Sequence, residues 1–582
     1  MRPAPPFVLL DDARAGGAAA RLYTHPRQVF TTREVTEVPG TIAQAVAAGG
    51  AVAGYLSYAA GAAFETTAPA AAPGATPLAW FGVFDGWTEV SDVAGLLPDP
   101  AAAWIGQPNP QPARGEYDAM FDAAQALIAA GDLYQINLTF RADAAIAGDP
   151  LALYAQLRGA ARAGWGAIVA TGREMLLSFS PELFFALDAG GALTCRPMKG
   201  TARRESDSRA DAAAARALAE DEKQRAENLM IVDLMRNDLA RVATAGSVRV
   251  PTLFEIEHYP TVHQMTSTVT ATLAPGRSAA DVLAALFPCG SITGAPKVRA
   301  MQAIETIERG NPRGAYTGAI GRIDPDGSAM FNVAIRTLTI HDDAAAATIG
   351  LGGGIVADSR ADDEWEEALA KAAFLGVEPR TVDLIETMAF DPFDGLLRIE
   401  RHLARMKASA TLLGFAFDRH TTRNELQAGT FRLREAARVR LALSRSGAIA
   451  IDVTPPPAVR SGPMQVALAP LPTTTLDWRL RHKTSDRGFY DAARRAAGTD
   501  EVVFVDEAGC VTEGSFTSVF VERDGVLVTP LMGPLLPGVL RGELLDSGRA
   551  IEGTLTADDL RGGFLIGNAL RGLMPAVLAV AQ

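Results

Sequence analysis

Acidic and basic side chains recur at helical spacing in two parts of the chain. Glu364, Glu367 and Lys371 fall at positions i, i+3 and i+7, so they share one face of a predicted helix. Because Glu367 and Lys371 are four residues apart, they could form a plain surface ion pair. Alternatively, Glu367 could meet Glu227 of a second helical stretch, and the two carboxylates could hold Mg²⁺ with water and substrate oxygens. Spacing alone leaves both interpretations open.

A glycine-rich segment precedes the predicted helix that carries Glu364, Glu367 and Lys371. Residues 350–354 read Gly-Leu-Gly-Gly-Gly. Consecutive glycines let the backbone approach a ligand, and their N–H groups can form a nest for an anion. A tight turn explains them equally well. Arg336, in a predicted strand, and Lys297, in the segment GSITGAPK (290–297), could complete a site for carboxylates.

A second group of candidate residues lies after residue 382. Lys483 is one of the few lysines there, and a lone lysine usually faces solvent. Glu513 lies beside a predicted strand, and residues 535–542 read as a turn that leads into a helix N-terminus, which is a natural phosphate site. Arg405 follows His402 by one helical turn.

The composition is that of an ordinary globular protein, with 582 residues of which 48% are hydrophobic and 21% charged. Lys and Arg number 54 against 67 Asp and Glu, and this net charge of −13 argues against nucleic-acid binding. Cys195, Cys289 and Cys510 are scattered, which excludes a disulfide scaffold and a CxxC zinc site and favours a reducing compartment. Since no apolar run reaches membrane-spanning length, we predict a cytoplasmic protein with no membrane association.

The elements that must position these residues alternate between helices and strands, as in α/β and α+β folds. The pattern predicts, among others, a helix over 207–242 and a strand over 330–340. It resets at a short linker over 376–381. We therefore predict two fused units, 1–375 and 382–582, with no internal repeat.

Longer motifs occur in the first unit. They are GDLYQINLT (131–139), SFSPELFF (178–185), RPMKGTARR (196–204), AENLMIVDLMRNDLARV (226–242), GSITGAPK (290–297), RGAYTGAIG (313–321) and GGGIVADS (352–359). Together, and in this order, they resemble the chorismate-utilising enzymes. The resemblance implies a large sheet-and-helix domain around a site for Mg²⁺ and chorismate.

Two positions distinguish members of that family. Lys199, in RPMKGT, stands where anthranilate synthases carry Ala and aminodeoxychorismate synthases carry Lys. Gln135, in LYQINL, stands where water-activating members carry a Lys base and ammonia-using members carry Gln. The resemblance therefore implies that chorismate and ammonia give 4-amino-4-deoxychorismate.

The resemblance also assigns roles within the first unit. Lys199 attacks C2 of chorismate as the C4 hydroxyl leaves, Glu182 acts as the general acid, and ammonia then displaces the lysine. His263 matches an active-site histidine, with a hydrogen-bonded structural histidine as the alternative. The metal ligands expected are Glu227, Glu364 and Glu367, and the substrate-binding residues expected are Gln135, Thr293, Lys297, Tyr316, Arg336, Gly352, Gly353, Gly354 and Lys371.

The nitrogen source is expected to lie outside this chain. A glutamine-hydrolysing module needs a Cys nucleophile in a Gly-x-Cys-x-Gly elbow with a His partner, and none of the three cysteines has that context. Cys289 precedes Gly290 but follows Pro288. We therefore expect a separate glutamine amidotransferase subunit, or free ammonia.

The second unit carries its own motifs. RIERHLARM (398–406), HKTSDR (482–487), VTEGSFTSVF (511–520), TPLMGPLLPGVLRGELL (529–545) and GNALRGL (567–573) resemble the fold-type IV pyridoxal phosphate enzymes. That group contains branched-chain and D-amino acid aminotransferases and aminodeoxychorismate lyases. The resemblance implies a two-lobed domain, and because such relatives are commonly dimers, we expect a homodimer formed through this unit.

The resemblance implies that Lys483 forms the Schiff base with pyridoxal 5′-phosphate and moves protons, and that Glu513 pairs with the pyridine nitrogen. The phosphate and its neighbouring loop would be held by Arg405, Gly538, Val539, Leu540 and Asn568. Ser518 departs from the family pattern, since many relatives carry Asn there.

Fusion favours a lyase for the second unit. A lyase that releases pyruvate from aminodeoxychorismate gives 4-aminobenzoate for folate synthesis, and its substrate is the product implied for the first unit. The alternative is an anthranilate- or isochorismate-type synthase joined to an aminotransferase or to a non-catalytic module.

Overall fold

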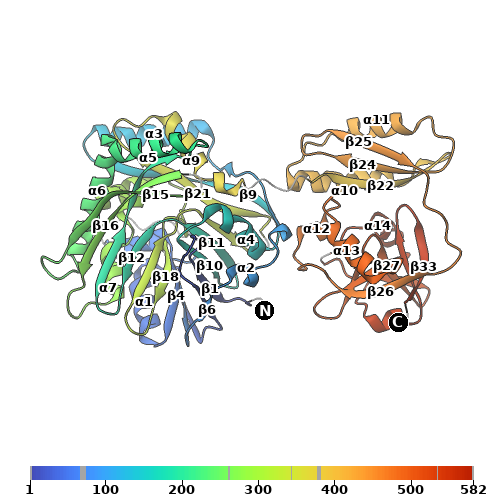
Figure 1. The fold of residues 1–582 in the computed structure, drawn as a ribbon, viewed down its shortest axis with the longest axis horizontal. Coiled ribbons are helices and arrows are strands. Elements are labelled where there is room, and N and C mark those ends of the chain that lie inside the picture. The colour runs from blue at the N-terminus through green and yellow to red at the C-terminus, as the bar shows by residue number, and fades with distance from the viewer. Residues whose placement is uncertain are drawn as a thin grey trace. The chain divides into compact units, whose positions relative to one another are not determined.

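The structure is a computed structural model that describes residues 3–65, 74–259, 262–342, 344–376, 382–533 and 535–579 (Figure 1). Contacts divide the chain into two compact units. The first comprises residues 1–97, 107–144 and 154–377, and the second comprises 98–106, 145–153 and 378–582. The predicted linker, 376–381, lies outside the described residues except for Gly376. Both helices and strands occur in each unit, which confirms the predicted mixed fold class.

One sheet of the first unit carries the glycine-rich segment. Its order is β17 (Gly294–Ala295), β9 (Gln135–Gly148), β21 (Ala346–Ile355), β20 (Thr337–His341), β11 (Glu174–Ser180), β10 (Trp165–Ala170), β1 (Phe7–Asp11), β2 (Ala20–Thr24) and β6 (Thr88–Val90), with β8 (Asn109–Pro110) beside β9. The residues 352–354 are therefore strand residues of β21 and form neither the turn nor the nest that we considered. In the sheet, β21 lies between β9 and β20.

The other sheet of the first unit carries Lys199. Its order is β14 (Met198–Arg203), β16 (Val262–Thr272), β13 (Ala192–Arg196), β12 (Leu183–Leu187), β19 (Ala329–Val333), β18 (Ala319–Ile323), β4 (Ala51–Leu56), β5 (Ala79–Phe84) and β3 (Gln28–Thr32), with β15 (Arg249–His258) beside β16. Tyr55, Trp80 and Ile320 of this sheet share one buried core with Val169 and Leu176 of the first sheet. The two sheets thus pack face to face, which excludes water from the apolar faces of both.

The helices before residue 377 are α1 (Val38–Ala47), α2 (Val93–Leu96), α3 (Arg114–Ala129), α4 (Pro150–Ala161), α5 (Ser208–Glu220), α6 (Glu222–Ala240), α7 (Ala279–Leu286), α8 (Lys297–Ile307) and α9 (Ala361–Ala370). The helix predicted over 207–242 is two helices. Asp221 lies between them with extended backbone (φ −66°, ψ 113°), and its carboxylate accepts a hydrogen bond from the Gln224 N–H at 2.8 Å. This N-cap starts α6 and ends the preceding helix.

The strand predicted over 330–340 is also divided, into β19 and β20. Arg336 lies between them with a φ of +50°, in the left-handed region that interrupts an extended strand. The break turns the chain from one sheet into the other. Among the described residues, no helix combines the length and the apolar character that crossing a membrane requires.

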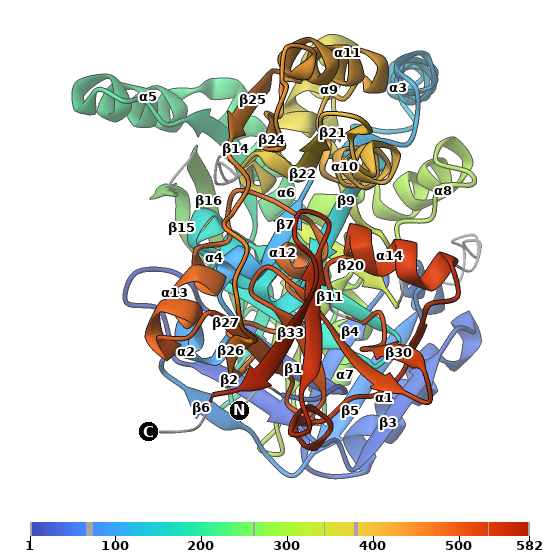
Figure 2. The same ribbon diagram turned by 90° about the vertical axis from the view of Figure 1, so that its right-hand side faces the viewer.

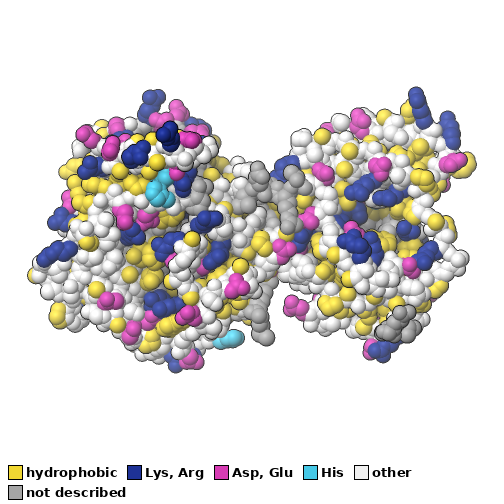
Figure 3. All heavy atoms as spheres, in the orientation of Figure 1, with side chains coloured by type: hydrophobic (Ala, Val, Ile, Leu, Met, Phe, Trp, Pro, Cys, Tyr) yellow, Lys and Arg dark blue, Asp and Glu magenta, His cyan; other side chains and the backbone are white. Residues whose placement is uncertain are grey.

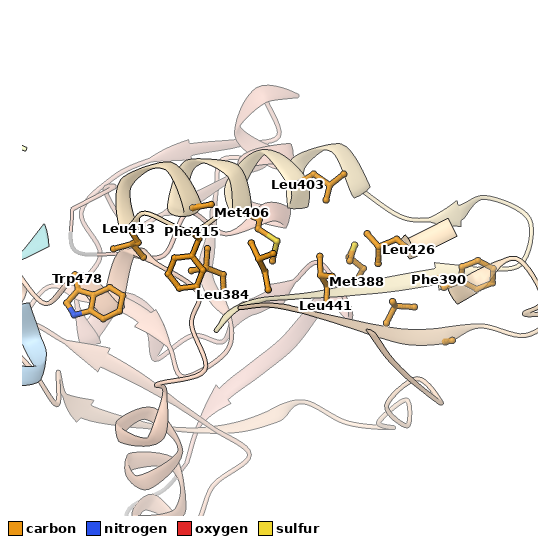
Figure 4. Close-up of a cluster of buried hydrophobic side chains, with 14 of the residues drawn as sticks. Leu384, Met388, Phe390, Leu403, Met406, Leu413, Phe415, Leu426, Leu441 and Trp478 are labelled. Atoms are coloured by element: carbon orange, nitrogen blue, oxygen red, sulfur yellow. The ribbon is translucent and has the colours of Figure 1, made fainter. Parts of the chain in front are cut away.

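The second unit has two lobes, as predicted. The first lobe is a sheet of order β23 (Gly395–Leu396), β22 (Leu384–Asp391), β24 (Ala437–Leu443) and β25 (Ile449–Thr454), with α10 (Ile399–Leu413) and α11 (Arg419–Thr430) on one face. In Figure 4, Leu403, Met406 and Leu413 of α10 point toward Leu384 and Leu441 of the strands. Alternate residues of β24 are buried, so its other side chains face away from this core.

The second lobe is a larger sheet. Its order is β28 (Val511–Gly514), β27 (Glu501–Val505), β26 (Met464–Pro470), β33 (Gly572–Leu578), β32 (Phe564–Asn568), β29 (Ser518–Arg523), β30 (Val526–Thr529) and β31 (Ala550–Glu552). Figure 2 shows β27, β26 and β33 side by side. The helices α12 (Trp478–Arg481), α13 (Gly488–Ala497) and α14 (Val539–Asp546) belong to this half of the chain.

Two early segments of the chain also belong to the second unit. Trp104, in β7 (Ala103–Ile105), joins the buried cluster that contains Leu384 and Trp478. The indole N–H of Trp478 donates a hydrogen bond to the carbonyl of Ala101 at 3.0 Å. The predicted boundary after residue 375 places both segments in the first unit. The large apolar area of Trp104, which packs in the core of the second unit, explains the difference.

Candidate functional site

The first candidate site centres on Lys199 in β14. The register between β14 and β16 shifts between Met198 and Thr201, so the strand is irregular at Lys199. The Lys199 carbonyl accepts a hydrogen bond from the Asn228 side chain of α6 at 3.1 Å. The Lys199 Nζ lies 3.2 Å from Oε2 of Glu227, also on α6. One helix therefore holds both the backbone and the amine of this lysine.

Gln135 and Gly354 come from the opposite sheet and meet Lys199. A Cβ atom on Gly354 would lie 2.8 Å from Nζ of Lys199 and 2.9 Å from Nε2 of Gln135. Gln135 is fully buried, and neither polar atom of its amide has a hydrogen-bond partner among the described residues. Because unsatisfied buried amides are costly, this one is suited to a ligand beside Lys199. The glycine gives that ligand room.

The carboxylates of α9 lie near enough to feel the charge of Lys199. A Cβ on Gly353 would lie 3.1 Å from Oε2 of Glu364 and 3.3 Å from Nζ of Lys371. Lys371 pairs with Glu367 at 2.9 Å and donates a hydrogen bond to the Gly352 carbonyl at 2.7 Å. The predicted i, i+4 pair is therefore formed, and it also anchors α9 to β21.

The charges of this cluster shift its acidic groups in opposite directions. The nearby ammonium of Lys371 lowers the pKa of Glu367. Burial and the negative charge of Glu367 raise the pKa of Glu364, although Ser359 donates a hydrogen bond to it at 2.6 Å. The charge of Lys199 acts on both carboxyl groups. Within the described part of the chain, no three acidic, His or Cys side chains are grouped closely enough to hold a metal ion alone.

Glu182 is a buried acid next to this cluster in sequence and space. Its carboxylate accepts a hydrogen bond from Oγ of Ser291 at 2.8 Å, and the charge of Lys199 acts on it. Burial raises the pKa of Glu182 to about 7. A carboxyl group with that pKa holds a proton for much of the time at neutral pH, as a general acid must. Ser291 was missed as a partner, although it lies in the motif GSITGAPK.

His263 makes contacts other than with Lys199. Its Nε2 lies 2.9 Å from Oδ1 of Asp211, and its Nδ1 lies 2.7 Å from Nδ1 of His258. Asp211 in turn binds the guanidinium of Arg204. These contacts match the alternative of a hydrogen-bonded structural histidine, and sequence spacing gave no sign of the His258 contact.

Lys297 and Thr293 use their polar atoms within the protein. Lys297 is buried, with its Nζ 2.5 Å from Oδ2 of Asp238 and 3.1 Å from the Leu286 carbonyl. The Thr293 hydroxyl donates to the carbonyls of Cys289 and Gly290. Both side chains stabilise the chain at the start of α8. Neither forms a described hydrogen bond or ion pair with the residues around Lys199.

Tyr316 and Arg336 flank the two sheets. The Tyr316 ring occupies the position that a Cβ on Gly350 would need, and burial raises its pKa. Burial lowers the pKa of Arg336. Among the described residues, no carboxylate forms an ion pair with the Arg336 guanidinium. This guanidinium is therefore available to an anionic ligand.

The second candidate site is a cavity of about 300 Å³ in the second unit. All seven residues proposed for the cofactor line it, namely Lys483, Glu513, Arg405, Gly538, Val539, Leu540 and Asn568. They come from the two lobes and from sequence positions far apart. The sequence motifs therefore identified residues that the fold places around one cavity.

Lys483 is buried in this cavity among positive charges. Burial and the guanidinium groups of Arg487 and Arg405 lower its pKa to about 7. Each of these effects disfavours the ammonium form. The amine is therefore uncharged and nucleophilic for much of the time near neutral pH, unlike the solvent-facing lysine that residue type alone favours.

Glu513 and Arg405 are held by partners that sequence reasoning missed. The Tyr490 hydroxyl donates to Oε1 of Glu513 at 2.5 Å, and burial raises the pKa of Glu513. Arg405 binds both carboxylate oxygens of Glu386, at 2.8 and 2.6 Å. Arg405 and His402 lower the pKa of Glu386 to about 2, despite its burial. Glu386 lies in β22, outside the motifs quoted above.

The end of the cavity that is suited to bind a phosphate lies at the start of α14. Gly538 is the N-cap residue, and a Cβ there would lie 2.6 Å from Oγ of Ser518. Arg405 donates to the carbonyl of Pro537, the residue before it, at 2.9 Å. Asn568 instead shapes its own turn, because its Oδ1 accepts the N–H groups of Leu570 and Arg571.

This donor set fits pyridoxal phosphate. The cavity offers an amine of lowered pKa, a buried carboxylate for a ring nitrogen and the N–H groups of a helix N-terminus for a phosphate. Nε of Arg438 and Nη1 of Arg487 are buried without a hydrogen-bond partner in the described residues, as expected where an anionic ligand binds.

Known families match both parts of the chain. Residues 10–376 match the chorismate binding enzymes, and residues 383–578 match the class IV amino-transferases, for which pyridoxal phosphate is the implied cofactor. Both predicted resemblances are confirmed. Aminodeoxychorismate synthase component 1 of Klebsiella aerogenes is 47% identical over 258 residues, which are 44% of this chain and 56% of that protein. The chain thus spans about half the length of this curated relative.

Two solved structures resemble the chain. Anthranilate synthase component I of Streptococcus pneumoniae has 25% identity and a TM-score of 0.52, over 64% of this chain and 93% of that one. A putative amino-acid aminotransferase from Mesorhizobium loti has 42% identity and a TM-score of 0.33, over 34% of this chain and 100% of that one.

Proposed function

This chain belongs to the chorismate binding enzyme family, and from that premise we propose that it makes 4-aminobenzoate in two steps. The first unit converts chorismate and ammonia to 4-amino-4-deoxychorismate, and the second releases pyruvate from that product. The observation that carries the proposal is the meeting of Lys199, Gln135 and Gly354. Lys199 and Gln135 are the two residues that distinguish ammonia-using, lysine-bearing members of the family.

In the first reaction the Lys199 amine attacks C2 of chorismate. A C–N bond forms at C2, both ring double bonds shift by one position, and the C4–O bond breaks. Glu182, with its pKa of about 7, supplies the proton with which the hydroxyl leaves as water. Ammonia then attacks C4, both double bonds return to their original positions, and the lysine leaves C2. The Gln135 amide, which lacks a partner in the described structure, is placed to orient the incoming ammonia.

Mg²⁺ would be held by Glu227, Glu364 and Glu367. These residues fit the ion in part, since they supply carboxylates but no preassembled group of three ligands in the described residues. Mg²⁺ commonly takes one or two protein carboxylates and fills its other positions with water and substrate oxygens. The ion would neutralise one substrate carboxylate, and Arg336 and Tyr316 would bind the other.

Ammonia would come from a separate glutamine amidotransferase subunit. The Klebsiella relative is named component 1, which supports a partner for this chain. Both free cysteines of the first unit, Cys195 and Cys289, are buried, and burial raises the pKa of each thiol. Neither is suited to be the nucleophile of a built-in glutaminase. Free thiols also support a cytoplasmic location.

In the second unit, bound pyridoxal phosphate would supply an electron sink. Lys483 would take the proton from C4 of the substrate and return one to the departing enolpyruvyl group, for which a pKa of about 7 is well matched. Glu513 would bind the ring nitrogen, and Arg405 with the first N–H groups of α14 would hold the phosphate. Loss of pyruvate leaves an aromatic ring, which makes the elimination favourable. We propose that this unit also forms the homodimer.

A second candidate for this unit is an aminotransferase, which the class IV amino-transferase match supports. One experiment tests both steps. The full chain is incubated with chorismate, Mg²⁺ and pyridoxal phosphate, with ammonia or with glutamine. We expect 4-aminobenzoate and pyruvate with ammonia, and much less product with glutamine alone.

Each alternative gives a different product. Anthranilate or isochorismate without aminodeoxychorismate would overturn the first assignment. Aminodeoxychorismate that accumulates without pyruvate, together with exchange of an amino group onto a keto acid, would replace the lyase with the aminotransferase.

A further inference from the structure

The cavity of the second unit is strongly cationic. Five of its lining residues in the described structure are basic, namely Arg405, Arg438, Lys483, Arg487 and Arg571, and one is acidic, Glu513. In Figure 3, Lys and Arg side chains also gather over the middle of this unit. An excess of positive charge in a partly buried cavity favours anionic ligands.

Most of these cations already have a task within the cavity. Arg405 is bound to Glu386 and to the carbonyl that precedes α14. Arg487 lies over the Tyr490 ring at 4.4 Å, and its charge acts on Glu513. Lys483 is the amine that the cofactor needs. The charge of Arg438 is not explained by any of these tasks.

Arg438 has no ion pair or hydrogen bond from its side chain to any described residue, and its Nε is buried. Its position is fixed by β24. Val439 and Leu441 face the core under α10, so Arg438 extends from the opposite face, where its main chain pairs with Ala389 and Thr454. A guanidinium held over a cavity without a carboxylate is costly unless a ligand supplies one.

We propose that Arg438 binds a substrate carboxylate that is remote from the reacting amine. This inference rests on the proposed function and names its substrate class: an amine on a six-membered ring that carries carboxylates on other carbons. An α-amino acid has its carboxylate on the carbon that bears the amine. In 4-amino-4-deoxychorismate both carboxylates lie several bonds from that carbon, so a separate cation must meet them.

The location of Arg438 argues against a role at the cofactor phosphate. The phosphate end is marked by Gly538 and by the Arg405 contact to Pro537. Arg438 lies instead on the small sheet, on the cavity wall that also includes Thr387. Arg571, which lies 5.9 Å over the Phe516 ring and has no acidic partner in the described residues, is a second cation for a dianion.

The test uses the full chain loaded with pyridoxal phosphate. Isophthalate, with two carboxylates on a ring, and benzoate, with one, are titrated calorimetrically. We expect the wild type to bind isophthalate more tightly. Arg438→Gln should weaken isophthalate binding about 10- to 100-fold, as expected for a charge-assisted hydrogen bond, and should erase the preference. Arg438→Lys keeps the charge but loses the planar fork, so it should restore part of the affinity.

Arg440 offers a matched control. It lies on the same strand and the same face, two residues away, but does not line the cavity. Arg440→Gln should leave both affinities unchanged. A wild type without preference for isophthalate, or an Arg438→Gln variant with unchanged affinity, would overturn the proposal. So would a variant that loses affinity for pyridoxal phosphate but keeps the preference, because Arg438 would then hold the phosphate.

A second assay separates this proposal from the proposed function. Pyruvate release from aminodeoxychorismate is measured for the same variants. In Arg438→Gln we expect KM to rise about 10- to 100-fold with a smaller change in kcat. If the wild type releases no pyruvate while isophthalate binding still depends on Arg438, the lyase assignment fails and the carboxylate subsite stands.

Discussion

The two candidate sites each present a lysine, but in opposite electrostatic surroundings. Lys199 lies 3.2 Å from Glu227 and acts on the carboxyl groups of Glu364 and Glu367. Lys483 lies among arginines, and its pKa falls to about 7. The first lysine must leave an ion pair before its lone pair can attack carbon. The second is uncharged for much of the time near neutral pH.

The difference teaches what each unit prepares in advance. In the second unit the amine is ready, and the cavity supplies cations for an anionic cofactor and an anionic substrate. In the first unit the acid is ready, because burial raises the pKa of Glu182 to about 7 and the carboxyl group therefore holds a proton for much of the time. Activation of Lys199 there depends on what binds to the surrounding carboxylates.

Replacing either lysine should give the largest effect and should separate the two sites. Lys483→Ala should abolish pyruvate release and let aminodeoxychorismate accumulate, because the amine that moves the proton is gone. Lys199→Ala should cut aminodeoxychorismate formation and leave pyruvate release from supplied aminodeoxychorismate intact. Chromatography of both products checks this. If Lys199→Ala forms aminodeoxychorismate at the normal rate, the covalent mechanism is wrong.

Removing the acid of the first site should give the next largest effect. Glu182→Gln keeps the shape of the side chain but has no proton to donate. We expect aminodeoxychorismate formation to fall about 10²- to 10⁴-fold, as is usual for a general acid. Chorismate binding, followed by calorimetry, should change little. A variant with near-normal turnover would show that another group protonates the leaving hydroxyl.

Filling the space beside Lys199 should have an intermediate effect. Gly354→Ala adds a Cβ 2.8 Å from Nζ of Lys199 and 2.9 Å from Nε2 of Gln135, both ends of flexible side chains. Since these groups can move, thermal stability should change little, whereas misplacing them should lower kcat/KM for chorismate about 10- to 100-fold. Gly376→Ala, whose Cβ would lie 3.3 Å from the Ala373 carbonyl, is a control. Equal losses in both variants would contradict the crowding argument.

Removing a hydrogen bond from Glu182 should give the smallest effect, seen in the pH profile. Ser291 donates to the Glu182 carboxylate, which favours the charged form and lowers the pKa. Ser291→Ala should therefore raise that pKa above about 7. The rate needs the protonated acid, so the fall in kcat at high pH should move to higher pH. Ser291→Thr, which keeps a hydroxyl, should behave like the wild type, and an unmoved or acid-shifted limb would contradict the assignment.

The sequence predicted most of what is local and less of what is distant. Motifs identified seven of the residues that line the cavity, and helical spacing predicted the Glu367–Lys371 pair. The sequence pattern also predicted one continuous helix through Asp221 and one continuous strand through Arg336. Both predictions were wrong, because helical and strand periods do not reveal a side-chain cap or a left-handed residue.

The partners of the site residues were the main gap. Glu182 and Ser291 are 109 residues apart, and Asp211 and His263 are 52 apart. Such contacts depend on how the sheets fold over one another, which no local pattern records. Lys297 shows the same limit, since its type suited a substrate anion, whereas the fold pairs it with Asp238.

The packing of Trp104 in the core of the second unit affects how the chain could be divided into two parts. A gene cut at the linker would encode a second half that lacks Trp104 and the Ala101 carbonyl, both of which its partner Trp478 uses. Exchange of that half as a cassette would therefore leave an apolar gap and an unpaired indole N–H. A second half that keeps these contacts would need residues 98–106 and 145–153 as well as residues 378–582.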